Sequence, residues 1–116
     1  MESGELKVGT LEQIIEVDDT HSAGVKVDVP EWGLAVLVRG LTYGEVREFG
    51  EVQDGIASDA FLLKTGLVSP SITPEQATEL VSKKGRVGLQ RVVEKVVELS
   101  GMGTGFREEP ADSDGA

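Results

Sequence analysis

The side chains best suited to chemistry in this sequence gather at Asp18, Asp19 and His21. His21 is the only histidine, and the chain of 116 residues has no cysteine, so a thiolate or His/Cys metal site cannot form within one copy. Two carboxylates and one imidazole need further ligands to hold a metal ion, and the sequence contains no second cluster to supply them. We therefore expect a solvated loop here, with no metal and no cofactor.

No other pattern predicts a catalytic centre. The glycine-rich stretch at residues 101–106 lacks the preceding strand, the lysine and the following helix of a phosphate-binding loop. No serine lies in a nucleophile elbow. Glu108 and Glu109 are adjacent, but they fall in a predicted tail where burial cannot raise a pKa. We therefore predict a protein that is not an enzyme and has no catalytic residues.

Composition limits the class of protein. With 39% hydrophobic residues, the chain fits one small domain. No apolar run reaches the length of a membrane span, and the first residues lack the features of a signal peptide, so we expect a soluble, cytoplasmic protein without a membrane partner. The net charge of −10 argues against nucleic acid as a partner, because phosphate binding requires a cationic surface.

The charge is unevenly distributed along the chain. Residues 1–59 carry a net charge of −9, residues 60–100 carry +2, and residues 101–116 carry −3. Copies with an acidic front and a mildly basic back would attract each other head to tail. The same asymmetry suits a protein that needs charge only for solubility, so both interpretations stay open.

A β-hairpin is predicted at about residues 24–39. Val25, Val27 and Val29 alternate with charged residues, as in a half-buried strand, and a second β-rich run follows a turn. Because a lone hairpin is barely stable, we expect the valine face to pack on helices. Trp32 at the turn suits either a partner-binding anchor or a lid over the small core.

Capping signals divide the remainder into helices. Residues 1–9 are expected to be a flexible arm, and the capping box at Thr10 predicts one or two helical turns after it. A second capping box at Thr42 begins a helical segment over about 42–65, with a break near residues 55–58 and Ser58 as a candidate cap.

Two more helices are predicted over about 74–84 and 87–100, after an extended link at residues 66–72. Thr73 is the expected N-cap of the first of them. The second helix carries an apolar stripe at helical spacing, which is either core or a surface for self-assembly. With Trp32, the exposed part of this stripe forms the predicted partner-binding residues: Leu89, Val92, Val93, Val96 and Val97.

Together these elements predict an α+β, mainly helical fold. A single domain would cover residues 10–100, with an N-terminal β-hairpin packed on a small bundle of about three to four helices. Residues 101–116 are rich in glycine and acidic residues, so we expect a disordered acidic tail.

The order of these parts resembles the tail assembly chaperones of long-tailed bacteriophages of the siphophage type. The likeness spans about residues 10–103. It rests on residues 27–33 (VDVPEWG), 66–75 (GLVSPSITPE) and 97–103 (VELSGMG).

The resemblance implies a non-catalytic chaperone that binds the tape measure protein, keeps it soluble and helps to recruit the major tail tube protein. Such chaperones self-associate in the host cell cytoplasm and are absent from the finished virion. Two other classes stay open. One is a structural virion component, such as a head-tail connector or tail protein, and the other is a small acidic regulator of a host protein.

Overall fold

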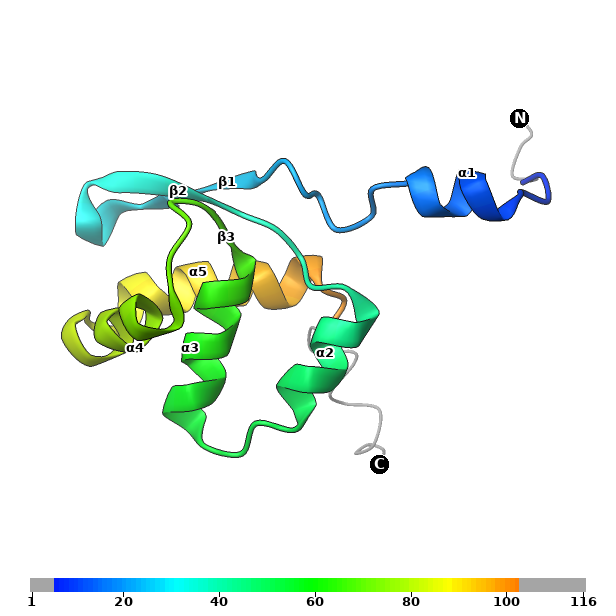
Figure 1. The fold of residues 1–116 in the computed structure, drawn as a ribbon. Coiled ribbons are helices and arrows are strands. Elements are labelled where there is room, and N and C mark those ends of the chain that lie inside the picture. The colour runs from blue at the N-terminus through cyan, green and yellow to red at the C-terminus, as the bar shows by residue number, and fades with distance from the viewer. Residues whose placement is uncertain (1–5, 103–116) are drawn as a thin grey trace, which may run out of the picture.

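A three-stranded antiparallel sheet lying over one long helix organises the fold (Figure 1). The computed structural model describes residues 6–102. The strands are β1 (Val25–Val29), β2 (Leu34–Val38) and β3 (Leu67–Ser69), in the order β1-β2-β3. The predicted hairpin is confirmed, and its turn is a short 3-10 helix, η1 (Pro30–Trp32), that ends at Gly33 with a φ of 69°. Glycine suits this left-handed conformation, which reverses the chain between β1 and β2.

The third strand was not predicted. Residues 67–69 lie in the segment that we predicted as an extended link, and Leu67 and Ser69 pair with the free edge of β2. A short pairing segment covers an edge whose backbone N–H and C=O groups would otherwise lack partners. The sheet is therefore larger than a hairpin, while the α+β, mainly helical fold class is confirmed.

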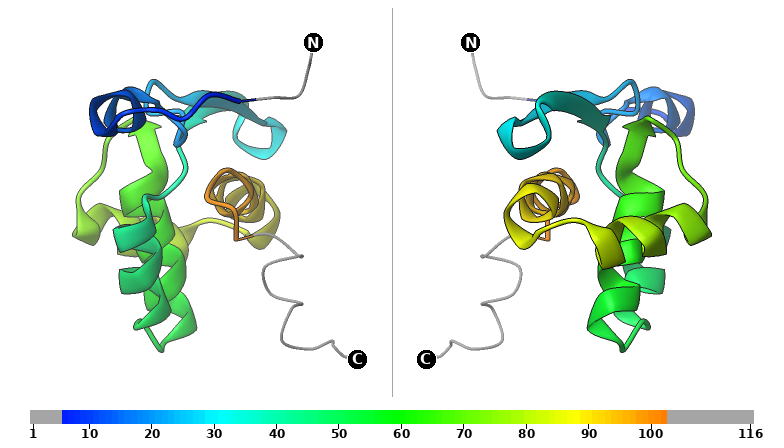
Figure 2. Two further views of the ribbon diagram at one scale, coloured as in Figure 1. Left: turned by 90° about the vertical axis from the view of Figure 1, so that its right-hand side faces the viewer. Right: turned by 90° about the vertical axis from the view of Figure 1, so that its left-hand side faces the viewer.

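Four helices form the body beneath the sheet: α2 (Tyr43–Gly50), α3 (Gly55–Gly66), α4 (Pro74–Lys83) and α5 (Arg86–Leu99). The capping boxes at Thr42 and Thr73 form as predicted, each with side-chain and backbone hydrogen bonds in both directions. Helix α3 packs mainly on α4 and α5, and Figure 2 shows the sheet as a layer above α5, with α2 and α3 descending from it.

The predicted helical segment over 42–65 breaks earlier than expected. The interruption lies at residues 51–54, and Asp54, not Ser58, caps α3 by accepting a hydrogen bond from the N–H of Ala57. Asp is as good an N-cap as Ser, and an N-cap at Asp54 lets Gly55 begin the helix. Ser58 lies inside α3 instead.

The core lies between the sheet, α3 and α5. Val29 and Val38 from the sheet, Leu63 from α3, and Val92 and Val96 from α5 are its largest fully buried side chains. The valine face of β1 packs toward this core as predicted, with Val29 buried and the other two valines half-buried.

The domain extends two residues beyond its predicted C-terminal boundary. Met102 is only 5% exposed and its N–H donates to the carbonyl of Val97, so residues 101–102 belong to the domain and not to the predicted tail. The rest of that tail, residues 103–116, and residues 1–5 of the predicted arm lie outside the described residues.

Helix α1 (Leu11–Glu16) forms from the predicted capping box of Thr10 and Gln13, but none of its residues is buried. It projects away from the body of the molecule (Figure 1). A helix of six residues is expected to dock on a surface, because isolated short helices are marginal in water. In the described part of the chain no such surface contacts it.

Candidate partner-binding groove

The apolar stripe of α5 divides into two rows with different environments. Val92 and Val96 are 0% exposed and pack in the core. Leu89, Val93 and Val97 occupy the neighbouring row and are half-buried. Since residues four apart lie on the same face of a helix, each row faces one direction along its whole length. One row therefore holds the fold together, and the other leaves apolar surface accessible.

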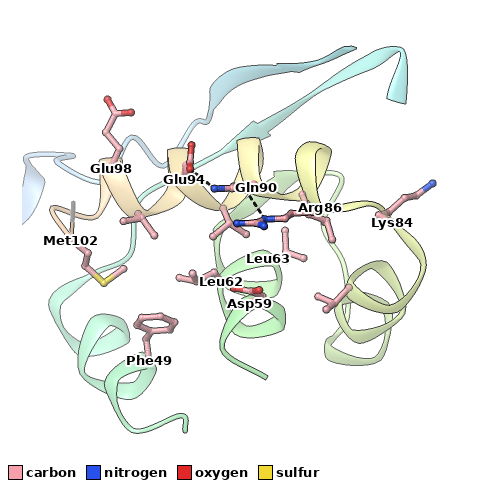
Figure 3. A pocket seen from close by; sticks show the side chains of 14 residues that line it. Phe49, Asp59, Leu62, Leu63, Lys84, Arg86, Gln90, Glu94, Glu98 and Met102 are labelled. Atoms are coloured by element: carbon pink, nitrogen blue, oxygen red, sulfur yellow. Dashed lines mark hydrogen bonds between the residues drawn. The ribbon is translucent and has the colours of Figure 1, made fainter. Parts of the chain in front are cut away.

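The accessible row lines an open groove of about 1100 Å³ (Figure 3). Every helix of the body contributes to it. Its apolar lining consists of Phe49 from α2, Leu62 and Leu63 from α3, Val81 from α4, Leu89, Val93 and Val97 from α5, and Met102. Helix-binding grooves in proteins are built from apolar side chains of this kind, which accept the residues of one helix face.

Charged groups lie at one end of the groove and along its rim. Lys84 and Arg86 lie at the junction of α4 and α5, whereas Phe49 and Met102 lie at the opposite end (Figure 3). Along the rim, Arg86 Nε donates to Gln90 Oε1 at 3.3 Å. Gln90 Nε2 in turn donates to Glu94 Oε2 at 2.8 Å. The groove thus has a basic end at Lys84 and Arg86. Three carboxylates, those of Asp59, Glu94 and Glu98, also line it, and Glu98 lies on the side of Met102.

Trp32 lies outside this groove. It is half-buried against the core, and a Cβ added at Gly88 would lie 2.7 Å from its Nε1 atom, so the indole packs directly on α5. Next to it, Arg91 donates two hydrogen bonds of 2.8 Å to the carboxylate of Glu31. Hydrogen bonding to Arg91 lowers the pKa of Glu31 from 4.5 to about 2. These contacts make Trp32 a lid on the core, one of the two roles predicted for it.

The cluster of Asp18, Asp19 and His21 forms a turn. The carboxylate of Asp18 accepts hydrogen bonds from the backbone N–H and the hydroxyl of Ser22 and from the hydroxyl of Thr20. The Ser22 N–H lowers the pKa of Asp18 below its ordinary value. Within residues 6–102, no group of three or more His, Cys, Asp or Glu side chains is arranged to hold a metal ion.

A second ion pair links the sheet to α2. Arg39, which follows β2, donates to both carboxylate oxygens of Glu45 at 2.9 and 3.0 Å. This hydrogen bonding to Arg39 lowers the pKa of Glu45, which also serves the capping box of α2. The described groups whose pKa values are shifted lie in such structural pairs and turns, and none of them lines the groove.

The predicted site residues therefore do not form one surface. Val92 and Val96 cannot contact a partner while the fold is intact, whereas Leu89, Val93 and Val97 line the groove. Leu62 and Leu63 are buried core residues at the floor of the groove, whereas Phe49 and Val81 are half-buried. These four residues come from three separate helices, so sequence spacing could not show that they line one groove.

No helix of residues 6–102 is long and apolar enough to cross a membrane. Comparisons with protein-family models, with curated proteins and with solved structures found no match to this chain.

Proposed function

We propose that this protein is a phage tail assembly chaperone that binds the tape measure protein in the α5 groove. The observation that carries the proposal is the row of Leu89, Val93 and Val97, which the domain's own core leaves accessible. An apolar groove between helices suits one face of an amphipathic helix, and covering such a face keeps a client from aggregating.

The sequence supports the same proposal. The segments that resemble tail assembly chaperones include residues 27–33, which contain the hairpin turn, and residues 97–103, which begin at Val97 in the last turn of α5 and continue beyond it in the sequence. The net charge of −10 favours solubility of a chaperone and client complex. On this proposal the protein is non-catalytic, acts in the host cell cytoplasm, helps to recruit the major tail tube protein and is absent from the virion.

Co-expression with the tape measure protein of the same phage tests the proposal. We expect the tape measure protein to become soluble and to elute with several copies of the chaperone in size-exclusion chromatography with light scattering. If the chaperone elutes alone while the tape measure protein precipitates, the proposal is wrong. Detection of the protein in purified virions would instead favour a structural virion component.

Two matched variants test the groove itself. Val93→Ser places a hydroxyl in the groove and should abolish most of the solubilisation. Val87→Ser is the control, because Val87 lies on the same helix, is 55% exposed and does not line the groove. Circular dichroism of both variants should show a folded protein. Equal solubilisation by the two variants would remove the groove as the binding site.

A further inference from the structure

Helix α1 presents an apolar face that no other described part of the chain covers. Ile14 and Ile15 are 64% and 71% exposed, and Leu11 and Val17 beside them are also exposed. The helix projects away from the body (Figure 1). Clusters of exposed large apolar residues mark interaction surfaces in soluble proteins, and a helix this short needs packing to be stable. Helix α1 therefore requires a partner surface.

The α5 groove is long enough to hold this face. Its row of Leu89, Val93 and Val97 extends over eight residue steps, which is about 12 Å along a helix axis. In α1 the apolar positions from Leu11 to Ile15 extend over four residue steps, about 6 Å, and Val17 follows as the extended C-cap. The face of α1 can thus lie along the row without leaving apolar side chains beyond its ends.

The charges of the two surfaces are complementary at the basic end of the groove, whereas Asp59, Glu94 and Glu98 line the rest of it. Lys84 and Arg86 lie at the basic end of the groove, and no carboxylate within residues 6–102 forms an ion pair with either. Residues 6–19 carry four carboxylates and one lysine, with Glu16 and Asp19 at or beyond the C-terminal end of α1. One orientation therefore places the apolar face over the apolar row and the acidic end at the basic end.

The connection between α1 and the sheet is fixed to the body. The carbonyl of Thr20 accepts a hydrogen bond of 2.8 Å from the N–H of Gly40, and Asp18 holds the turn at Ser22. These contacts direct α1 beyond the end of the sheet (Figure 1), whereas the groove opens beneath α5 toward α2, α3 and α4 (Figure 3). A second copy can present its groove to α1 without breaking them.

From these matches we infer that α1 of one copy docks in the α5 groove of a second copy, so that the copies associate head to tail. In a pair of copies joined in this way, one copy still has a free groove and the other still has a free α1. Further copies can therefore add at both ends, and such a contact builds rings or filaments. The inference goes beyond the proposed function, because it holds whatever client the groove also binds.

Sedimentation velocity over a wide range of protein concentrations tests the inference. The average mass of the full chain should rise with concentration. The variant Ile14→Ser/Ile15→Ser should weaken self-association by about tenfold or more, because two apolar side chains are lost from the contact. Leu34→Ser is the control, since Leu34 is also an exposed apolar residue but lies in β2, and it should leave self-association unchanged.

Charge reversal distinguishes docking between copies from docking within one copy. Glu16→Lys/Asp19→Lys and Lys84→Glu/Arg86→Glu should each weaken self-association, because like charges then meet at the end of the groove. An equimolar mixture should associate again, since each variant's α1 matches the groove of the other. The acidic replacement at residue 86 lies in the first turn of α5, where the helix dipole favours it, whereas the one at residue 84 lies at the C-cap of α4, where the dipole disfavours it. Circular dichroism should therefore confirm that this variant is folded.

Several results would overturn the inference. The inference is wrong if the chain remains a monomer at all concentrations. It is also wrong if the Ile14→Ser/Ile15→Ser variant associates as strongly as the Leu34→Ser control, or if the mixture of charge variants does not associate. Protection of the α1 amides from hydrogen exchange in a dilute monomer would place α1 in its own groove and would also overturn it. None of these measurements includes the tape measure protein. Their results therefore test the contact between copies whether or not co-expression makes the tape measure protein soluble.

Discussion

Contacts between the hairpin turn and α5 show how single residues hold the two layers together. Trp32 packs over Gly88, and Glu31 forms two hydrogen bonds with Arg91 one turn away on the same helix. The members of each pair are far apart in the sequence, so these contacts form only when the sheet has reached its place on the helix. The only tryptophan of the chain therefore reports directly on this contact.

Replacement of Gly88 by alanine should separate the turn from the helix. The added Cβ would lie 2.7 Å from Nε1 and 3.0 Å from Cε2 of Trp32, too close for the rigid indole to stay in place. We expect a loss of about 1–3 kcal/mol in the free energy of unfolding, as for other overpacked cores. Urea unfolding measures this loss, and Trp32 fluorescence should shift to longer wavelength.

Gly50→Ala is the matched control for that substitution. Gly50 lies in α2, and an added Cβ would meet no atom within 4 Å. Alanine there should stabilise the fold by about 0.5–1 kcal/mol through helix propensity. Equal effects of the two substitutions would contradict the close packing of Trp32 on Gly88.

The ion pair of Glu31 and Arg91 should make stability depend on pH in acid. The pKa of Glu31 is about 2 in the folded protein against an ordinary value of 4.5, so the unfolded chain takes up the proton first as the pH falls. The stabilisation is present above about pH 4.5 and is lost as the pH falls toward 2. Glu31→Gln should therefore lower the melting temperature at pH 7, and the difference from the native chain should shrink over this window.

A double-mutant cycle isolates the pair. If Glu31 acts through Arg91, the variant Glu31→Gln/Arg91→Gln should be more stable at pH 7 than the sum of the two single changes predicts. Additive losses would mean that the two side chains act independently. A difference between Glu31→Gln and the native chain that stays constant from pH 7 to pH 2 would assign the effect to another contact.

Helix α5 has two roles, one for each of its apolar rows: the row of Val92 and Val96 holds the core together, and the row of Leu89, Val93 and Val97 lines the groove. Val96→Ala should cost about 2–3 kcal/mol of stability, because Val96 is 0% exposed and its removal leaves a cavity. Val93→Ala should cost less than half as much, since its side chain already faces the open groove. Chemical denaturation of both variants measures the difference. A loss for Val93→Ala as large as that for Val96→Ala would place Val93 in the core.

Helix α1 illustrates how an element can form locally and still lack a place to pack. Its capping box satisfies backbone N–H groups at the first turn, so the helix begins where the sequence specifies. Its apolar face, however, has no counterpart in the described part of its own chain. This separation of local structure from packing is the basis for the inferred contact between copies.

For the whole molecule, the two proposals predict competition for one groove. If α1 of a second copy and the client bind the same row of α5, the client must displace α1. The variant Ile14→Ser/Ile15→Ser should then bind a tape measure segment more tightly than the native chain at concentrations where the native chain is associated. Isothermal titration of both proteins with the same segment measures this. Weaker binding by the variant would show that α1 contributes to the client site.

Local sequence was sufficient to predict most of the elements, because their signals depend on neighbouring residues. Side chains a few positions apart specify the capping boxes at Thr10, Thr42 and Thr73, and alternation specifies β1. The same reasoning identified the apolar stripe of α5. It misplaced the start of α3, because Asp54 and Ser58 are both good N-caps and the choice between them depends on where the preceding helix ends.

Only the tertiary structure decided what each apolar residue faces. β3 exists because β2 has a free edge within reach, and Met102 is buried because it joins the core formed by the sheet, α3 and α5. The division of the α5 stripe into a core row and a groove row likewise depends on which sides of the helix the sheet and α3 occupy. Packing joins residues that are distant in the sequence, so periodicity can show that a face is apolar but not what covers it.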